Sequence, residues 1–238
     1  MLYAWIDGVK RPPLTKGERT TCRDCGGLLT SVIPVENVKH WRHEGGDCDP
    51  WSEPEGPWHL GWKEQFDLNC REICLIDRAT GERHRADVLC GEGTASATVL
   101  ELQHSSISEE ELAAREAFYR RERRMFWLVH LPDETTARAA RRAAPYSNYM
   151  ICLGISSPEY NIDGRTYAVM EIVRRIQFIE KWKRATADVF FDWRGHIFFL
   201  AAEEVSRRLG GGVPLKKGES ALCRMTREAF IRAVHGNG

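Results

Sequence analysis

The segment from 97 to 131 constrains the fold most, because it places a strand, a capped helix and a second strand in direct succession. ATVLELQ has the β-branched and apolar content of a strand. Ser108 and Glu111 form a capping box, which opens a helix running to about Arg124. MFWLVHL lacks alternation, as is typical of a strand buried on both faces. A connection of this length favours a right-handed crossover with the two strands parallel.

The preceding residues extend this pattern. Trp58, Trp62 and Phe66 lie one turn apart and predict a helix over about 58–70. Strands are expected at about 73–77 and 84–90, before the one at 97–103, with ATGE and GEGT at the turns between them. The order helix, three strands, helix, strand predicts an α/β (α+β) core with a central mixed sheet flanked by helices.

The remaining chain gives weaker patterns. Near the N-terminus, YAWIDGVKR predicts a strand–turn–strand unit with a tight turn at Asp7-Gly8. After Pro132 we expect a helix at about 134–144, a strand at YMICLGI, a helix over 167–182, a hairpin in DVFFDWRGHIFFL and a final helix capped by Thr226. The expected domains are a zinc-binding module at 1–50, a core at 51–132 and a C-terminal α/β region at 133–238.

Composition narrows the location more than the function. The start lacks the charged-then-apolar pattern of a signal peptide, and no apolar run is long enough to cross a bilayer, so we expect a cytoplasmic protein without membrane contact. The eight cysteines are then expected to be thiols or metal ligands. Acids dominate 44–72 and bases dominate from 174 onward, which suits metal and phosphate binding respectively, or solvated surface in both cases.

A cysteine–histidine cluster predicts a structural zinc site. Cys22 and Cys25 form a CxxC turn, and His40 and His43 follow a short apolar stretch. Two thiolates and two imidazoles satisfy tetrahedral Zn²⁺, which would supply the folding energy that so small a module lacks. Cys48 is an alternative ligand. The other interpretation is two buried cysteines with two surface histidines.

The hairpin of the second and third core strands carries a possible catalytic face. Antiparallel pairing brings Asp87 close to Glu101, and Gln103 shares the face of Glu101. Two converging carboxylates repel each other unless a cation lies between them, and Mg²⁺ or Mn²⁺ accepts such oxygens and can promote phosphodiester hydrolysis. The alternative is the solvated face of a half-exposed sheet.

The helix before the hairpin carries His59 and Lys63 on one face. If this helix packs against the sheet, Lys63 supplies a positive charge that aids attack by water, and His59 assists. Lys63 could equally be a solvated helix lysine.

The helix after the hairpin carries Arg115 and Tyr119 one turn apart. Arg115 could hold a DNA phosphate and Tyr119 could stack on a base. Alternatively Arg115 pairs with Glu111 on the surface and Tyr119 is a core residue. The basic run 120–124, with Arg138, Arg141 and Arg142, could follow a DNA backbone or form a solvated face.

Taken together, CRDC…HWRH, HLGWK, RADV and ELQHSSIS followed by AAREAFY resemble the competence protein CoiA-like family over roughly 20–130. The resemblance implies a PD-(D/E)XK restriction-endonuclease-like core in which Asp87 is the first metal-binding acid and Glu101 the second. Gln103 then occupies the position of the usual lysine, and Lys63 is the candidate for a lysine relocated to the helix. ExQ is similar to what this family has.

These features predict a Mg²⁺- or Mn²⁺-dependent deoxyribonuclease that acts on DNA in competence, recombination or defence. The missing strand lysine motivates an alternative, a non-catalytic DNA-binding or adaptor protein on a degenerate nuclease scaffold. A zinc hydrolase is disfavoured, because the chain has no HExxH and its Cys/His set leaves no open coordination position.

Overall fold

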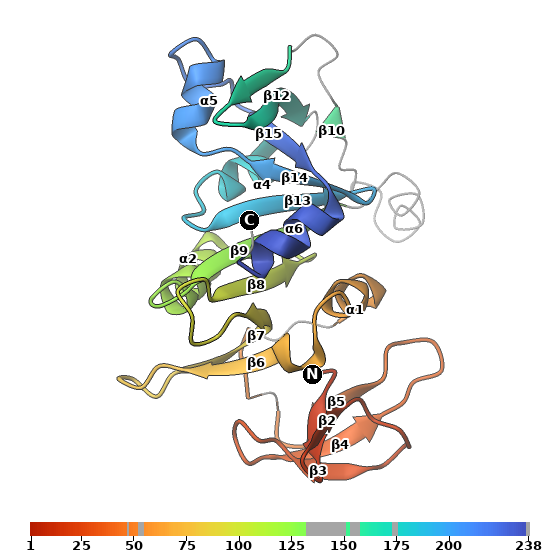
Figure 1. Cartoon of the computed structure of the whole chain (residues 1–238). Coiled ribbons are helices and arrows are strands. Elements are labelled where there is room, and N and C mark those ends of the chain that lie inside the picture. The colour runs from red at the N-terminus through yellow and green to blue at the C-terminus, as the bar shows by residue number, and fades with distance from the viewer. Residues whose placement is uncertain (47, 52–54, 132–150, 153–157, 173–175, 237–238) are drawn as a thin grey trace. The chain divides into compact units, whose positions relative to one another are not determined.

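A computed structural model describes residues 1–46, 48–51, 55–131, 151–152, 158–172 and 176–236 (Figure 1). The chain divides into two compact units, Met1–Leu100 and Glu101–Gly238. Within the described residues, no helix has the length and apolar character needed to cross a membrane. The seven cysteines in this part of the chain are free thiols.

The first unit begins with short strands in two small antiparallel sheets: β1 (Ala4–Ile6) with β2 (Val9–Arg11), and β3 (Arg19–Thr21), β4 (Leu28–Val32) and β5 (His40–His43). Asp7 and Gly8 join β1 to β2 with φ of 49° and 81°, the left-handed pair that a tight hairpin turn requires. The predicted strand–turn–strand unit is therefore confirmed. Cys22, Leu29 and Trp41 lie in a small buried cluster of this module.

The rest of the first unit contains the predicted helix and hairpin. The helix is shorter than predicted, since α1 (Pro57–Lys63) ends before the extended backbone of Asp67, and a 3₁₀ turn follows (Leu68–Cys70). Three strands follow as predicted: β6 (Arg71–Ile76), β7 (Arg83–Cys90) and β8 (Thr98–Gln103), the last of which crosses into the second unit. β7 pairs antiparallel with both β6 and β8, with Val88 opposite Leu100.

The second unit is built on a mixed sheet. Its strand order is β10 (Ile151–Cys152), β12 (Arg165–Ile172), β15 (Glu219–Met225), β14 (His196–Leu200), β13 (Asp188–Trp193), β9 (Arg124–Leu131), with β11 (Tyr160–Ile162) beside β12. β9 and β13 are parallel, whereas β13, β14 and β15 are antiparallel to their neighbours in turn. The mixed sheet expected from the sequence is therefore present, and β9 begins where MFWLVHL was predicted to be a buried strand.

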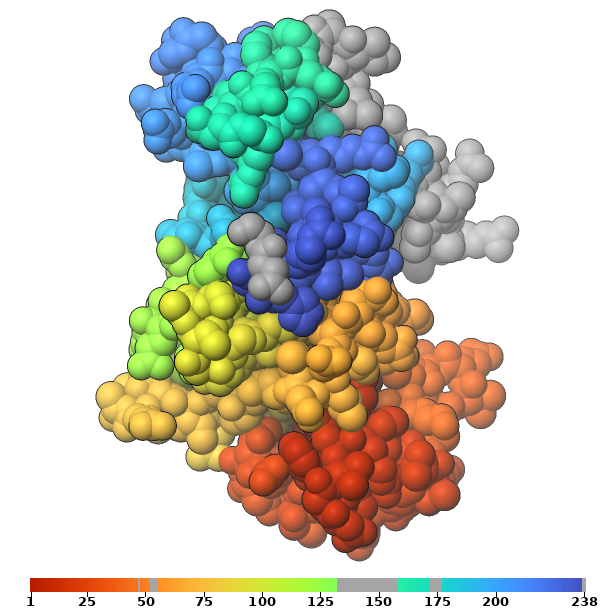
Figure 2. Space-filling model, in the orientation of Figure 1, coloured from red at the N-terminus to blue at the C-terminus, as the bar shows by residue number. Residues whose placement is uncertain are grey.

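Helices cover both faces of this sheet. Successive side chains of a strand point to opposite faces. Phe191 of β13 contacts Phe178 of α4 (Ile176–Trp182), with ring centroids 6.4 Å apart, while Phe190 contacts Phe230 of α6 (Arg227–Val234) at 4.8 Å. α6 lies toward the viewer in Figure 1, and Figure 2 shows its residues covering the strands behind them. The sheet is thus an internal layer, as its aromatic strands require.

Several details of the second unit differ from the predictions. The helix predicted over 167–182 is wrong in its first half, which is strand β12 where Tyr167 and Met170 are buried. Strand β15 and helix α5 (Glu203–Leu209) were not predicted. The helix expected at 134–144, and YMICLGI apart from β10, lie outside the described residues.

Other details match. The hairpin of β13 and β14 turns at Arg194-Gly195, and Thr226 caps α6 by accepting a hydrogen bond from Ala229 N at 3.1 Å. Ser108 likewise caps α2 (Glu109–Tyr119), which ends earlier than the predicted Arg124. Strands on either side of the expected boundary at Pro132 pair in one sheet, so that boundary does not separate two sheets.

Candidate active site and metal centre

The turn between β3 and β4 is shaped to present two thiols. Cys22 N–H donates to Gly27 O at 2.7 Å, and Gly26 N–H donates back to Cys22 O at 2.8 Å. Gly26 has a φ of 74°, which glycine adopts without steric cost. Gly27 N–H donates to Cys25 Sγ at 3.3 Å, an interaction that stabilises a thiolate. The sequence CRDCGG therefore builds the turn that a CxxC metal ligand pair needs.

Four side chains of the first unit converge at this turn. The ligand atoms of Cys22, Cys25, His43 and Cys48 all lie within 4.8 Å of one another. Cys25 Sγ and His43 Nε2 are 3.5 Å apart. Three sulfurs and one imidazole are a donor set typical of tetrahedral zinc. The cluster could hold a metal such as zinc.

The ligand set differs from the predicted one at a single position, where Cys48 stands in place of His40. Along β5 the side chains alternate in burial, with Trp41 and His43 buried and Arg42 exposed. His40 and His43 are three residues apart, so a strand directs them to opposite faces. His40 Nδ1 instead lies 3.0 Å from Val38 O. The HxxH spacing was interpreted as if both histidines could face one ion, which a strand does not allow.

Polar contacts tie this cysteine turn to strand β7. Arg85 of β7 forms an ion pair with Asp24, between the two cysteines, at 2.7 Å. Asp49, next to Cys48, accepts a hydrogen bond from Arg85 N at 2.7 Å and lies 3.0 Å from His84 Nδ1. Because β7 also carries Asp87, the metal module and the predicted catalytic strand are joined within one unit.

Lys63 lies at the centre of a buried ionic cluster. Its side chain is 1% exposed, and its Nζ contacts Glu55 at 2.7 Å, Asp87 at 2.9 Å and Glu72 at 3.1 Å. We call these four residues the Lys63 cluster. The helix lysine thus reaches the first predicted acid, and the alternative of a solvated lysine is excluded. Helix α1 and strand β7 are the elements that bring the pair together.

One ammonium faces three carboxylates, and the cluster is therefore rich in negative charge. Burial acts to lower the pKa of Lys63, but Asp87 and Glu72 raise it well above its ordinary value. Burial acts to raise the pKa of Glu72, but Lys63 holds it well below its usual range. Burial together with the charges of Glu72 and Asp87 raises the pKa of Glu55 to about 8, despite Lys63. The cluster has less positive charge than its carboxylates can accept.

Glu72 and Glu55 were not predicted as site residues. Glu72 begins β6 with a φ of 48°, uncommon for a residue with a side chain, and its carboxylate accepts hydrogen bonds from Leu2 N and Tyr3 N at 2.8 and 3.1 Å. The acidic character of 44–72 was the one available signal, since it suggested metal binding there without naming residues. His59, predicted to assist, is buried on α1 and packs edge-to-face against Trp58 at 5.1 Å.

The second unit contains the other predicted acid. Glu101 and Gln103 on β8 are 3% and 1% exposed, so neither stands on a solvated sheet face. Glu101 Oε2 pairs with Arg115 Nη1 at 3.0 Å, and Gln103 Nε2 donates to Ser105 O at 3.3 Å. The alternative in which these two residues are exposed sheet polar groups is therefore excluded.

Arg115 and Tyr119 do not present a DNA-binding surface. Arg115 is 4% exposed and bridges Glu101 and Glu111; burial acts to lower its pKa, but these carboxylates hold it above its ordinary value. Tyr119 is 1% exposed and packs edge-to-face on Phe118. Arg115 therefore fixes Glu101 rather than a phosphate, and Tyr119 is a core residue. The exposed bases at this end of α2 are Arg120 and Arg121.

Asp87 belongs to the first unit and Glu101 to the second, so a metal ion shared between them stays a prediction. Comparison with known proteins adds no further constraint. No protein-family model, no curated protein and no solved structure matches the chain.

Proposed function

We propose that the chain is a metal-dependent DNA nuclease of the kind implied by its resemblance to the CoiA-like family. The observation that carries the proposal is the 2.9 Å contact between Lys63 Nζ and Asp87 Oδ1. Strand β8 has Gln103 where a PD-(D/E)XK nuclease has lysine, and a lysine from α1 contacts the first acid instead. A lysine buried in this way is costly unless several acids compensate its charge, so it is an unusual residue to find by accident.

The register of the hairpin supports a shared metal site. β7 and β8 pair with Val88 opposite Leu100. Asp87 directly precedes Val88 and Glu101 directly follows Leu100. Continuing the ladder by one pair would put the two acids opposite each other on one face. Mg²⁺ or Mn²⁺ would be their ligand, since hard divalent cations prefer carboxylate oxygens.

In the proposed mechanism the chain's residues position the reacting groups. A divalent ion bound by Asp87 and Glu101 would polarise a phosphodiester and lower the pKa of a bound water. Lys63 holds Asp87 in place and offers its ammonium to the attacking water or a phosphate oxygen. Arg115 holds Glu101, and Gln103 orients water. The cysteine turn and its zinc would keep β7 in position through Arg85.

The test is cleavage of labelled single- and double-stranded DNA with Mn²⁺, Mg²⁺ or EDTA. We expect metal-dependent cutting that falls to the EDTA background in Asp87→Asn and in Glu101→Gln. Glu92→Gln is the matched control, because this exposed acid lies in the turn of the same hairpin. Full cleavage by both acid variants, with Glu92→Gln also unchanged, would refute the proposal.

A second candidate is a DNA-binding or adaptor protein that no longer cuts. It is favoured by Gln103, which replaces the strand lysine and bonds to Ser105. Under this alternative the wild-type protein binds DNA but leaves it intact in every metal. The same assay, with a gel-shift measurement beside it, separates the two candidates.

A further inference from the structure

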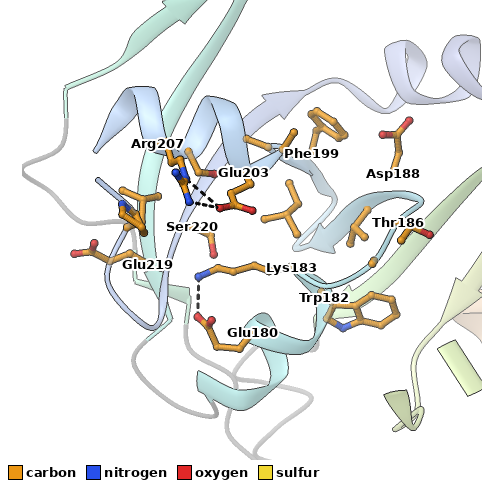
Figure 3. Close-up of a pocket in the computed structure, with 18 of the residues that line it drawn as sticks. Glu180, Trp182, Lys183, Thr186, Asp188, Phe199, Glu203, Arg207, Glu219 and Ser220 are labelled. Carbon is orange, nitrogen blue, oxygen red and sulfur yellow. Dashed lines mark hydrogen bonds and ion pairs between the residues drawn. The ribbon is translucent and has the colours of Figure 1, made fainter. Parts of the chain in front are cut away.

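The second unit contains a pocket that has no part in the proposed nuclease site. Its volume is about 490 Å³, and it is formed by α4, β13, β14, α5 and the start of β15 (Figure 3). This size is within the range of sites for small molecules. Its lining residues fall between 180 and 220, and all of them belong to the described part of the chain.

The walls of the pocket are largely apolar. Aromatic and aliphatic side chains supply them, including Trp182, Val189, Phe199, Leu200 and Leu215. In the view of Figure 3, Phe199 and Trp182 lie on one side of the pocket, whereas Ser220 lies on the other among charged side chains. A ligand would therefore meet flat apolar surface at one end and polar groups at the other.

The charged residues at the polar end are paired with one another. Lys183 and Glu180 lie 2.7 Å apart, and Arg207 and Glu203 lie 3.0 Å apart (Figure 3). Glu219 also lines this end and accepts a hydrogen bond from Lys216 N at 3.0 Å. Because each cation faces a carboxylate, neither an anion nor a cation gains an unopposed partner here.

The charge at the opposite end is also offset. Asp188 lines the pocket, and the positive charges of Arg124 and Arg165 act on its carboxylate. The pocket as a whole therefore favours an uncharged ligand over a charged one.

Two buried polar atoms in the lining lack a hydrogen-bond partner among the described residues. They are Ser220 Oγ, on a residue that is 1% exposed, and Trp182 Nε1, on a residue that is also 1% exposed. An unmet hydrogen bond at a buried group is destabilising, so such groups call for an explanation. The indole N–H can only donate and the hydroxyl can donate or accept, so a ligand that satisfies both must carry an acceptor.

We propose that this pocket binds an uncharged planar heterocycle with hydrogen-bonding groups along one edge, which is the chemistry of a nucleobase. Ser220 and Trp182 contact the polar edge, and Phe199 supplies apolar surface to the ring. Aromatic side chains and a few placed polar groups are how proteins hold such rings. This inference does not depend on the nuclease proposal, because no residue of the pocket belongs to the Lys63 cluster or to β8.

The test is calorimetric titration of the full chain with adenosine, guanosine, cytidine and thymidine. Deoxyribose 5-phosphate and phenylalanine serve as probes with an anionic or a zwitterionic head. We expect millimolar or tighter binding of at least one nucleoside and none of the two charged probes. Binding of neither class, or of only the charged probes, would overturn the proposal and leave a solvent-filled cavity or a different ligand class.

Two variants assign the binding to this pocket. Ser220→Ala removes the hydroxyl and should weaken nucleoside binding about tenfold, which equals about 1.4 kcal/mol, without lowering the unfolding midpoint of the free protein. Thr166→Ala, an exposed hydroxyl on the neighbouring strand β12, is the matched control and should bind as the wild type does. Ser206→Phe places a ring in the pocket lining and should abolish binding. Unchanged affinity in both Ser220→Ala and Ser206→Phe would show that the nucleoside binds elsewhere.

Discussion

Lys63 Nζ lies 2.9 Å from Asp87 Oδ1, and this contact joins helix α1 to strand β7 inside the first unit. The lysine also contacts Glu55 and Glu72, so a single ammonium holds three carboxylates. The contact therefore carries both a structural and a proposed catalytic role, and stability measurements can separate the two.

Removing the ammonium should destabilise the protein strongly. Lys63→Met leaves three carboxylates near one another with no cation, and breaking a buried ion pair in this way costs about 3–5 kcal/mol in the free energy of unfolding. Urea denaturation measures the loss. Arg184→Met is the control, because its partner Glu109 is exposed, and such pairs contribute about 1 kcal/mol or less. Equal small losses in both variants would contradict the buried cluster.

The Lys63 cluster should also make stability depend on pH. Glu55 has its pKa raised to about 8 in the folded protein, against an ordinary value of 4.5. Between these values the folded state keeps a proton that the unfolded state releases, so stability falls as pH rises, by up to about 1.4 kcal/mol per pH unit. Glu55→Gln should remove this decline, which urea unfolding at pH 5 to 8 measures.

Glu72 has the opposite effect in a lower window. Its folded pKa lies well below the ordinary 4.5, so its contribution is complete above that value and is lost as pH falls below it. Stability should therefore rise with pH up to about 4.5. A Glu55→Gln variant that still loses stability between pH 5 and 8 as steeply as the wild type would argue against the raised pKa of Glu55.

The corrected ligand set predicts which variants lose zinc. The purified chain should bind one zinc ion, and Cys48→Ala should lose it because a sulfur of the four-residue cluster is removed. His40→Ala should keep its zinc, since His40 faces away from the cluster. Elemental analysis of dialysed protein gives the zinc content. The reverse pattern would restore the ligand set first expected from the sequence.

DNA binding should depend on exposed bases and not on Tyr119. Replacing Arg120 and Arg121 by glutamine should weaken binding and reduce the salt dependence of the affinity by about one for each phosphate that is no longer neutralised. Tyr119→Ala should instead cost about 3–5 kcal/mol in the free energy of unfolding, as expected for a large core side chain. Filter binding over a salt series, beside thermal unfolding, distinguishes these effects. A salt dependence unchanged in the arginine variant would exclude this end of α2 as a DNA-binding surface.

Local patterns predicted the elements whose signals lie within a few residues. The capping serine of α2, the capping threonine of α6, and the turns of both short hairpins follow from local hydrogen bonding and backbone preference. Lys63 was predicted from one helix face and one missing strand lysine. Each of these predictions needed only neighbours in sequence or one pairing of strands.

The sequence could not reveal contacts that depend on distant parts of the chain. Glu72 is positioned by the backbone of Leu2 and Tyr3, some seventy residues away. Tyr167–Ile172 is strand because β12 pairs with β15, which itself had no clear pattern. Arg115 and Glu111 have a spacing that suits a surface pair, and only the position of Glu101 makes their pairing a buried one.

The contacts of Arg85 and His84 with Asp24 and Asp49 have a consequence for how the first unit opens. The turn that carries the cysteines and the strand that carries Asp87 share these bonds, so local unfolding of one exposes the other. The amide hydrogens of β7 should then exchange with solvent at rates set by the cysteine turn. An oxidant that attacks its thiols would reach the strand of Asp87 without touching a single carboxylate.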